Sequence, residues 1–198
     1  AEPAVTAATL TVPILRNLKP EASGTTSVAP PKPQTMRVGL AVFEWPGQLR
    51  VLIEMADADA PSLSSREHRL WNEIALAMYG REQAYEAQSI PVFRFPPTPR
   101  MKSLETPDAV RDAVEGFLQA RQARSTVALQ VMFAGHGLAA AYTGSVGAQV
   151  QEPLQVDMGD AGTRLLLPSL SQLLEDACLK APVWRALASA LQRSGLRA

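Results

Sequence analysis

The distribution of apolar positions divides the chain into two parts of different character. Residues 1–35 are rich in Ala, Pro, Thr and Ser and close on the segment APPKPQ. Because Pro fixes the backbone and removes a hydrogen-bond donor, this composition predicts a flexible or partly polyproline-like tail. From Met36 onward, apolar residues recur at strand or helix spacing, which predicts a single folded domain over residues 36–198.

One apolar island interrupts the predicted tail. Its members are Leu10, Val12, Ile14, Leu15 and Leu18. The island has two interpretations that the residues alone leave open. It is either an apolar patch in a linker or on its own domain, or a short peptide that docks on another protein and becomes ordered on binding.

The first two strands of the domain are predicted as an antiparallel hairpin. Large and small apolar residues alternate over residues 36–43, and residues 49–55 form an almost continuous apolar run. Alternation is typical of a strand with one buried face, and a continuous run is typical of a central strand. The segment Trp45-Pro46-Gly47 between them is a turn signal.

After the hairpin, helical and strand patterns alternate. A helix begins at Ser64 or Ser65 and stops at Gly80, and Thr106 followed by Pro107 predicts the start of a second helix. Further strands are expected at residues 90–95, 127–133 and 163–167, and further helices at 138–142 and 181–192. This order predicts an α/β fold: a three-layer, doubly wound, mainly parallel sheet with a leading antiparallel hairpin.

Two local expectations concern the end of the chain. Residues 170–179 are expected to form an apolar helical turn, and Trp184 is expected to pack its ring against the sheet.

Composition limits the classes of function. The 19 basic and 19 acidic residues give a net charge of zero, which counts against a free-standing nucleic-acid binder. The single Cys178 excludes a disulfide framework and a multi-cysteine metal site, so no metal or cofactor is expected. No apolar run reaches the about 20 residues that span a bilayer, so no membrane partner is expected. Few cysteines and no signal pattern favour the cytoplasm.

Candidate chemistry gathers where the predicted strands end, because open α/β sheets bind ligands at the carboxyl ends of their strands. Asp57 and Asp59 follow one strand, although aspartates in such a segment are also common turn formers. His136 follows another, yet no nucleophile or carboxylate is placed beside it by sequence. His68 lies between charged residues on a predicted solvated helix face.

Three segments carry a resemblance to a known family. The segment LLLPS contains Leu167, Pro168 and Ser169, the segment RFPPTPR contains Pro96, Pro97 and Arg100, and FAGHGLAA is a glycine-containing strand-to-helix turn around His136. Together they resemble the uracil-DNA glycosylase superfamily in the order and position of its landmarks.

The resemblance implies a glycosylase-like fold whose chemistry is altered. The family has a His where this chain has Leu167, and an apolar side chain donates no hydrogen bond to a departing base. Phe95 replaces a Cys of the iron–sulfur members, so no cluster is implied. Asp57 and Asp59 stand where active relatives position the attacking water. The degenerate pocket implied by the resemblance comprises Asp57, Asp59, Pro96, Pro97, Arg100, His136, Leu167, Pro168 and Ser169.

The segment order resembles one non-enzymatic branch of this fold, the psi family of the bacterial DNA polymerase III clamp-loader assembly. The likeness covers residues 36–198 and includes the hairpin and the final Trp-containing helix. It implies that the island Leu10 to Leu18 grips a clamp-loader subunit. It also implies that the folded part holds a chi-like subunit, which links it indirectly to single-stranded DNA through single-strand binding protein.

Two alternatives belong to other classes. An active DNA-repair glycosylase would flip a base into a pocket at the strand ends, which Leu167 argues against. A Pro-rich-tethered envelope scaffold protein is suggested by the segment APPKP, and would require a membrane anchor upstream of Ala1.

Overall fold

The structure is a computed structural model that describes residues 36–84, 88–98, 106–157 and 163–196. Its internal contacts divide the chain into two units, Ala1–Pro33 and Gln34–Ala198. The apolar island from Leu10 to Leu18 and the predicted site residue Arg100 lie outside the described residues. The account below concerns the second unit.

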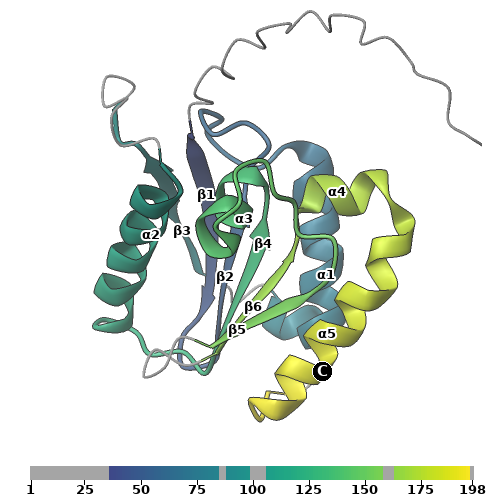
Figure 1. Ribbon diagram of the computed structural model, residues 1–198. Coiled ribbons are helices and arrows are strands. Elements are labelled where there is room, and N and C mark those ends of the chain that lie inside the picture. The colour runs from purple at the N-terminus through teal and green to yellow at the C-terminus, as the bar shows by residue number, and fades with distance from the viewer. Residues whose placement is uncertain (1–35, 85–87, 99–105, 158–162, 197–198) are drawn as a thin grey trace, which may run out of the picture. The chain divides into compact units, whose positions relative to one another are not determined.

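Six strands form one sheet in the order β3-β1-β2-β4-β6-β5 (Figure 1). Their bounds are β1 Val38–Trp45, β2 Leu49–Glu54, β3 Gln88–Phe95, β4 Leu129–Ala134, β5 Leu154–Asp157 and β6 Thr163–Pro168. Strand β1 pairs antiparallel with β2, which confirms the predicted hairpin. Strands β2, β4 and β6 are parallel neighbours.

The predicted α/β class is confirmed, but the expectation of a mainly parallel sheet is wrong. Strand β3 pairs antiparallel with β1, and β5 pairs antiparallel with β6, so the sheet is mixed. Sequence patterns missed β5 because it is a short edge strand with little burial. Leu154 is 43% exposed, and Pro153 immediately precedes the strand.

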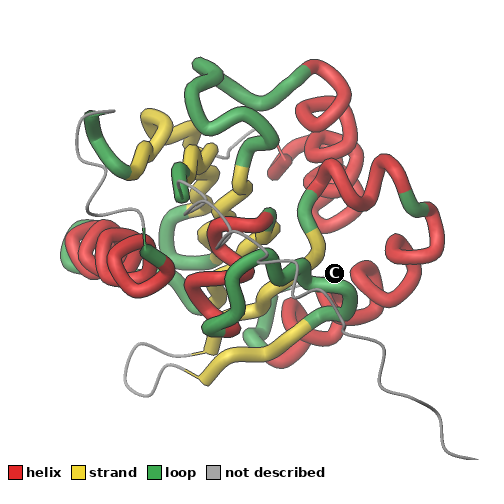
Figure 2. Tube along the Cα trace, turned by 45° about the horizontal axis from the view of Figure 1, so that its top comes forward, coloured by secondary structure: helices red, strands yellow, loops and turns green. Residues whose placement is uncertain are grey.

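Helices cover both faces of the sheet (Figure 2). The bounds are α1 Ser65–Ala84, α2 Pro107–Gln122, α3 His136–Thr143, α4 Leu170–Glu175 and α5 Lys180–Arg193, with a short 3-10 helix, η3, at Ala177–Leu179. Side chains of α1, α4 and α5 share a buried cluster with one face of the sheet. Side chains of α2 and α3 share a second buried cluster with the other face. The folded unit is therefore a three-layer arrangement.

Local capping explains where the predicted helices begin and end. The hydroxyl of Thr106 accepts a hydrogen bond from the Ala109 amide, and Pro107 occupies the first helical position of α2. Ser64 and Glu67 exchange hydrogen bonds at the start of α1. Gly80 has φ 73° and ψ 178°, so it breaks the helical backbone of α1 at the predicted stop.

The helical turn expected over residues 170–179 is confirmed as the helix α4 followed by η3. A capping box starts α4: the Ser169 hydroxyl accepts from the Gln172 amide, and the Gln172 side chain accepts from the Ser169 amide. Leu170 and Leu173 form the buried face of this short helix.

The expectation that Trp184 packs against the sheet is wrong. Its side chain is 39% exposed, although it lies on the predicted helix α5. The buried stripe of this helix consists of Val183, Leu187, Ala190 and Leu191. At 100° per residue, Trp184 falls on the flank of that stripe rather than at its centre.

Among the described residues, none of the helices combines the length and apolar character that crossing a membrane would require.

Candidate functional site

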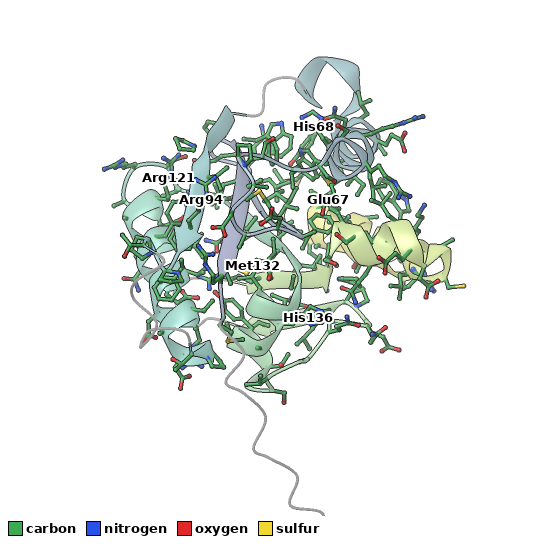
Figure 3. The ribbon with its side chains drawn as sticks, turned by 90° about the horizontal axis from the view of Figure 1, so that it is seen from above. Glu67, His68, Arg94, Arg121, Met132 and His136 are labelled. Carbon is green, nitrogen blue, oxygen red and sulfur yellow. The ribbon has the colours of Figure 1, made fainter. Side chains whose placement is uncertain are left out.

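A crevice of about 420 Å³ opens at the carboxyl ends of β2, β4 and β6. This is the edge of the sheet at which open α/β folds bind ligands. Figure 3 looks onto this edge and labels His136 beside it. The polar and charged side chains of the lining are Arg37, Glu54, His136, Gln149, Ser169, Ser171, Gln172 and Glu175.

Glu54 is the buried acid of the crevice. It is the last residue of β2, and only 7% of its surface is exposed. Its carboxylate oxygens accept hydrogen bonds of 2.8 Å from the backbone amides of Gly137 and Leu138. These amides belong to the first turn of α3, where N–H groups lack partners within the helix. Glu54 therefore joins β2 to the start of α3.

The glycine of this turn permits the close approach. A Cβ atom at Gly137 would lie 2.3 Å from Cγ2 of Val38 and 3.0 Å from the Glu54 carboxylate. Both distances are too short for a side chain to fit without movement of its neighbours. The absence of a side chain at Gly137 therefore lets α3 pack close to β1 and to Glu54.

Burial governs the ionisation of Glu54. Removal from water raises the pKa of this carboxyl group above its ordinary value. Hydrogen bonds from the amides of Leu138, Gly137 and Gly135, together with the charge on His136, lower the pKa but do not cancel that effect.

The hydroxyl groups of the two serines in the crevice form hydrogen bonds that stabilise the fold. The Ser169 hydroxyl caps α4 by accepting from the Gln172 amide at 3.2 Å. The Ser171 hydroxyl donates to Oε1 of Glu67 at 2.8 Å and so links α4 to α1. Glu67, labelled in Figure 3, is 3% exposed and also caps α1 through Ser64. Neither hydroxyl has a histidine within hydrogen-bond distance, so neither is arranged as an activated nucleophile.

His136 lies at the exposed rim. Its Nε2 atom is 3.3 Å from Nε2 of Gln149, across the crevice-lining loop that follows α3. This agrees with the interpretation of His136 as a polar residue at a helix start.

Among the members of the predicted pocket that the structure describes, His136 and Ser169 line the crevice together. Asp57 and Asp59 lie in the loop after β2 but do not line the crevice. Oδ1 of Asp57 accepts from the Asp59 amide at 2.9 Å, which is a local turn contact. The Asp59 carboxylate forms a two-bonded ion pair with Arg37 at 2.5 and 2.6 Å.

Leu167 does not line the crevice. It is fully buried among the side chains that face α1 and α5, opposite Phe133 in the neighbouring strand. Leu165 and Leu167 share one face of β6 and belong to the same buried cluster, whereas Ser169 lies beyond the end of the strand, at the N-cap of α4, and lines the crevice. Pro168 and Pro96 are buried and Pro97 is exposed, and none of the three lines the crevice.

A second polar cluster lies at the opposite end of the sheet. Glu44, Arg50, Gln130 and Arg164 stand in one row across β1, β2, β4 and β6. Arg50 donates to Glu44 at 2.9 Å and to the Ser125 carbonyl at 2.8 Å, and both charged side chains are almost fully buried.

Arg164 completes this row through α2 and α3. It donates to Gln130 at 2.7 Å and pairs with Glu115 of α2, whose carboxylate also accepts from the Tyr142 hydroxyl of α3. Burial by itself raises the pKa of the Glu44 carboxyl group. The hydrogen bond and charge of Arg50, together with smaller effects of Ser125 and Arg121, lower it by more. The pKa of Glu44 is therefore below its ordinary value.

Sequence reasoning missed Glu54, Arg50 and Arg164. The available signal was a charged residue inside an otherwise apolar strand, which is rare unless the charge is paired. The partners lie up to 84 positions away in the chain, so their identity was not readable from local pattern. Across the described segments, three or more His, Cys, Asp or Glu residues nowhere gather as they would to hold a metal ion.

Comparison with known families, curated proteins and solved structures found no match to this chain.

Proposed function

We propose that this chain is a non-enzymatic, cytoplasmic adaptor subunit with a degenerate glycosylase-like, doubly wound fold, acting in the replicative clamp-loader assembly as psi-family proteins do. In this role the island from Leu10 to Leu18 binds a clamp-loader subunit. The folded unit binds a chi-like subunit and so links the assembly to single-strand binding protein. A tethered apolar peptide raises the effective concentration of its partner without a rigid interface.

The observation that carries the proposal is the use of Glu54. A glycosylase acid must activate water or support a developing charge, so its carboxylate oxygens are expected to face the substrate and not the framework of the fold. Both oxygens of Glu54 accept hydrogen bonds from backbone amides of α3, and Gly137 holds that helix against them. The carboxylate at the head of the crevice thus stabilises the fold.

The resemblance and the crevice serine support the same role. Leu167, which the resemblance aligns with the base-expelling His, is enclosed in the core and presents no hydrogen-bond donor to the crevice. The hydroxyl of Ser169, the nearest polar group in sequence, caps α4.

Two measurements on the purified full chain test the proposal. Size-exclusion chromatography with the clamp loader of the same cell is expected to give a joint complex, and the double variant Ile14→Asp, Leu18→Asp is expected to abolish it. A uracil-release assay on uracil-containing single- and double-stranded DNA is expected to show no turnover. Measurable release, or failure of the full chain to join the clamp loader, would contradict the proposal.

A further inference from the structure

The outer face of α5 differs from the rest of the described surface. Trp184 is 39% exposed, and α5 is the helix in the yellow part of Figure 1. In the described segments, the other large apolar side chains exposed to this degree are the aliphatic residues Val146 and Leu154. An exposed indole is costly to leave in water and is enriched in the centres of protein interfaces.

The residues beside Trp184 leave its ring accessible. Positions 181 and 188 lie one turn away on the same side of the helix, and both are alanines. Small neighbours give a partner side chain room to lie against the indole.

The charges on α5 have one sign. Its 14 residues include Lys180, Arg185 and Arg193 and contain no acid. No carboxylate of the described residues lies within ion-pair distance of these three cations. Arg37, Arg69 and Arg111 each form an ion pair on the surface, whereas Arg66 and Arg124, like the cations of α5, form none with the described residues. The nearest acid in sequence, Asp176, caps η3 by accepting from the Cys178 amide.

We propose that Trp184, Lys180 and Arg185 form a docking surface, the α5 face, for an acidic protein segment that carries an apolar side chain. The apolar side chain packs on the indole between Ala181 and Ala188, and the flanking carboxylates pair with the two cations. The inference rests on the proposed adaptor role and assigns a surface to the contact made by the folded unit.

Charge complementarity favours an acidic protein segment over a nucleic acid. Single strands bind across successive aromatic platforms in a basic groove, and α5 offers one indole on a convex helix. The chain as a whole has no net charge, so no long-range field draws a polyanion to it.

A peptide titration tests the surface chemistry. The probe is a fluorescein-labelled peptide, Asp-Glu-Asp-Leu-Phe-Asp-Glu-Asp, titrated with the full chain at 50 mM salt. We expect binding to weaken at least tenfold in Trp184→Ala and in Arg185→Glu, and to weaken as salt rises. Arg69→Glu makes the same change of charge on the exposed surface of α1, and Val146→Ala removes another exposed apolar side chain. Both controls are expected to bind as the wild type does.

Site-specific crosslinking identifies the occupant. The photo-crosslinker p-benzoylphenylalanine is placed at Ala181 of the tagged full chain in its native cell, with Trp184 retained. The proposal expects a crosslink to an acidic segment of another protein, lost when Trp184→Ala is added. Equal peptide binding by all variants, or a crosslink to nucleic acid, to a non-acidic segment or to a second copy of the chain, would overturn it.

The outcome separates this inference from the proposed function. If Trp184→Ala still binds the chi-like subunit and no acidic crosslink forms, the α5 face is wrong while the adaptor role stands. If an acidic segment is captured but the full chain does not join a clamp loader, the surface stands and the adaptor assignment fails.

Discussion

The two ends of the sheet bury acids in opposite ways. At the carboxyl ends of the parallel strands, Glu54 is held by backbone amides of α3 without a paired cation in hydrogen-bond contact. At the other end, Glu44 is held by the guanidinium of Arg50. The pKa of Glu54 is raised and that of Glu44 is lowered. The comparison teaches that dipoles can hold a buried carboxylate in place without stabilising its charge as fully as a cation does.

Both arrangements serve the fold. The hydrogen bonds of Glu54 connect β2 to α3. Those of the row of Glu44, Arg50, Gln130 and Arg164 connect the strands to α2, to α3 and to the loop after α2, and give these buried polar side chains hydrogen-bond partners. What remains available to other molecules is the outer surface, where the α5 face presents an indole and unpaired cations.

Removal of Arg50, at the end of the sheet that holds the Glu44–Arg50 ion pair, has the largest expected effect on stability. Arg50→Ala leaves Glu44 buried without its principal partner, so we expect a loss of about 3–5 kcal/mol in the free energy of unfolding. Urea denaturation at pH 7 measures it. The control is Arg69→Ala, which breaks an exposed pair with Glu73 and should cost about 1 kcal/mol or less. Equal losses in the two variants would contradict the account of the buried row.

The pH dependence of two isosteric variants tests the contrast itself. Because the folded pKa of Glu44 is depressed, its contribution to stability is present above its unfolded pKa and is lost as pH falls. Glu44→Gln should therefore destabilise more as pH rises through about 4.5. The folded pKa of Glu54 is raised, so its contribution is full below the unfolded pKa and declines as pH rises. Glu54→Gln should destabilise less as pH rises through the same region.

Urea unfolding at intervals from pH 4 to 8 gives the loss of stability of each variant relative to the wild type. The slope of that loss against pH is then compared between the two variants. At the acidic end, we expect Glu54→Gln to cost about 1–3 kcal/mol, because its amide nitrogen cannot accept a hydrogen bond from α3. If the loss of stability changes with pH in the same direction in both variants, the pKa values of Glu44 and Glu54 are not shifted in opposite directions.

Trp184 provides the smallest expected effect on stability. Trp184→Ala should cost less than about 1 kcal/mol because the ring is partly exposed, whereas Trp71→Ala should cost about 3–5 kcal/mol because Trp71 is 2% exposed in the core. Thermal or urea unfolding compares them directly. A large loss at Trp184 would place its ring in the core and remove the α5 face.

Sequence patterns recovered the elements that depend on local physics. Thr106 with Pro107 fixed the start of α2, and the turn at Pro46 and Gly47 preceded the second strand of the hairpin. They failed where the outcome depended on distant partners. Strand β3 pairs with β1 through contacts far apart in the chain, and no local pattern distinguishes that placement from a parallel one.

The site shows the same limit. His136 and Ser169 were found because they follow strands, whereas Glu54 was missed because its role depends on α3, more than 80 positions later. Leu167 was assigned to the crevice by analogy of motif, but it lies within β6, whose two faces are both covered by buried clusters. A shift of two positions, from Leu167 to Ser169, separates a buried residue from one that lines the crevice.

The most direct test of the adaptor role is quantitative mass spectrometry of proteins that copurify with the tagged full chain from its native cell. The account predicts clamp-loader subunits at a fixed molar ratio to the chain, and their loss from the double variant Ile14→Asp, Leu18→Asp. Absence of clamp-loader subunits from the wild-type sample, or their retention by the double variant, would contradict it.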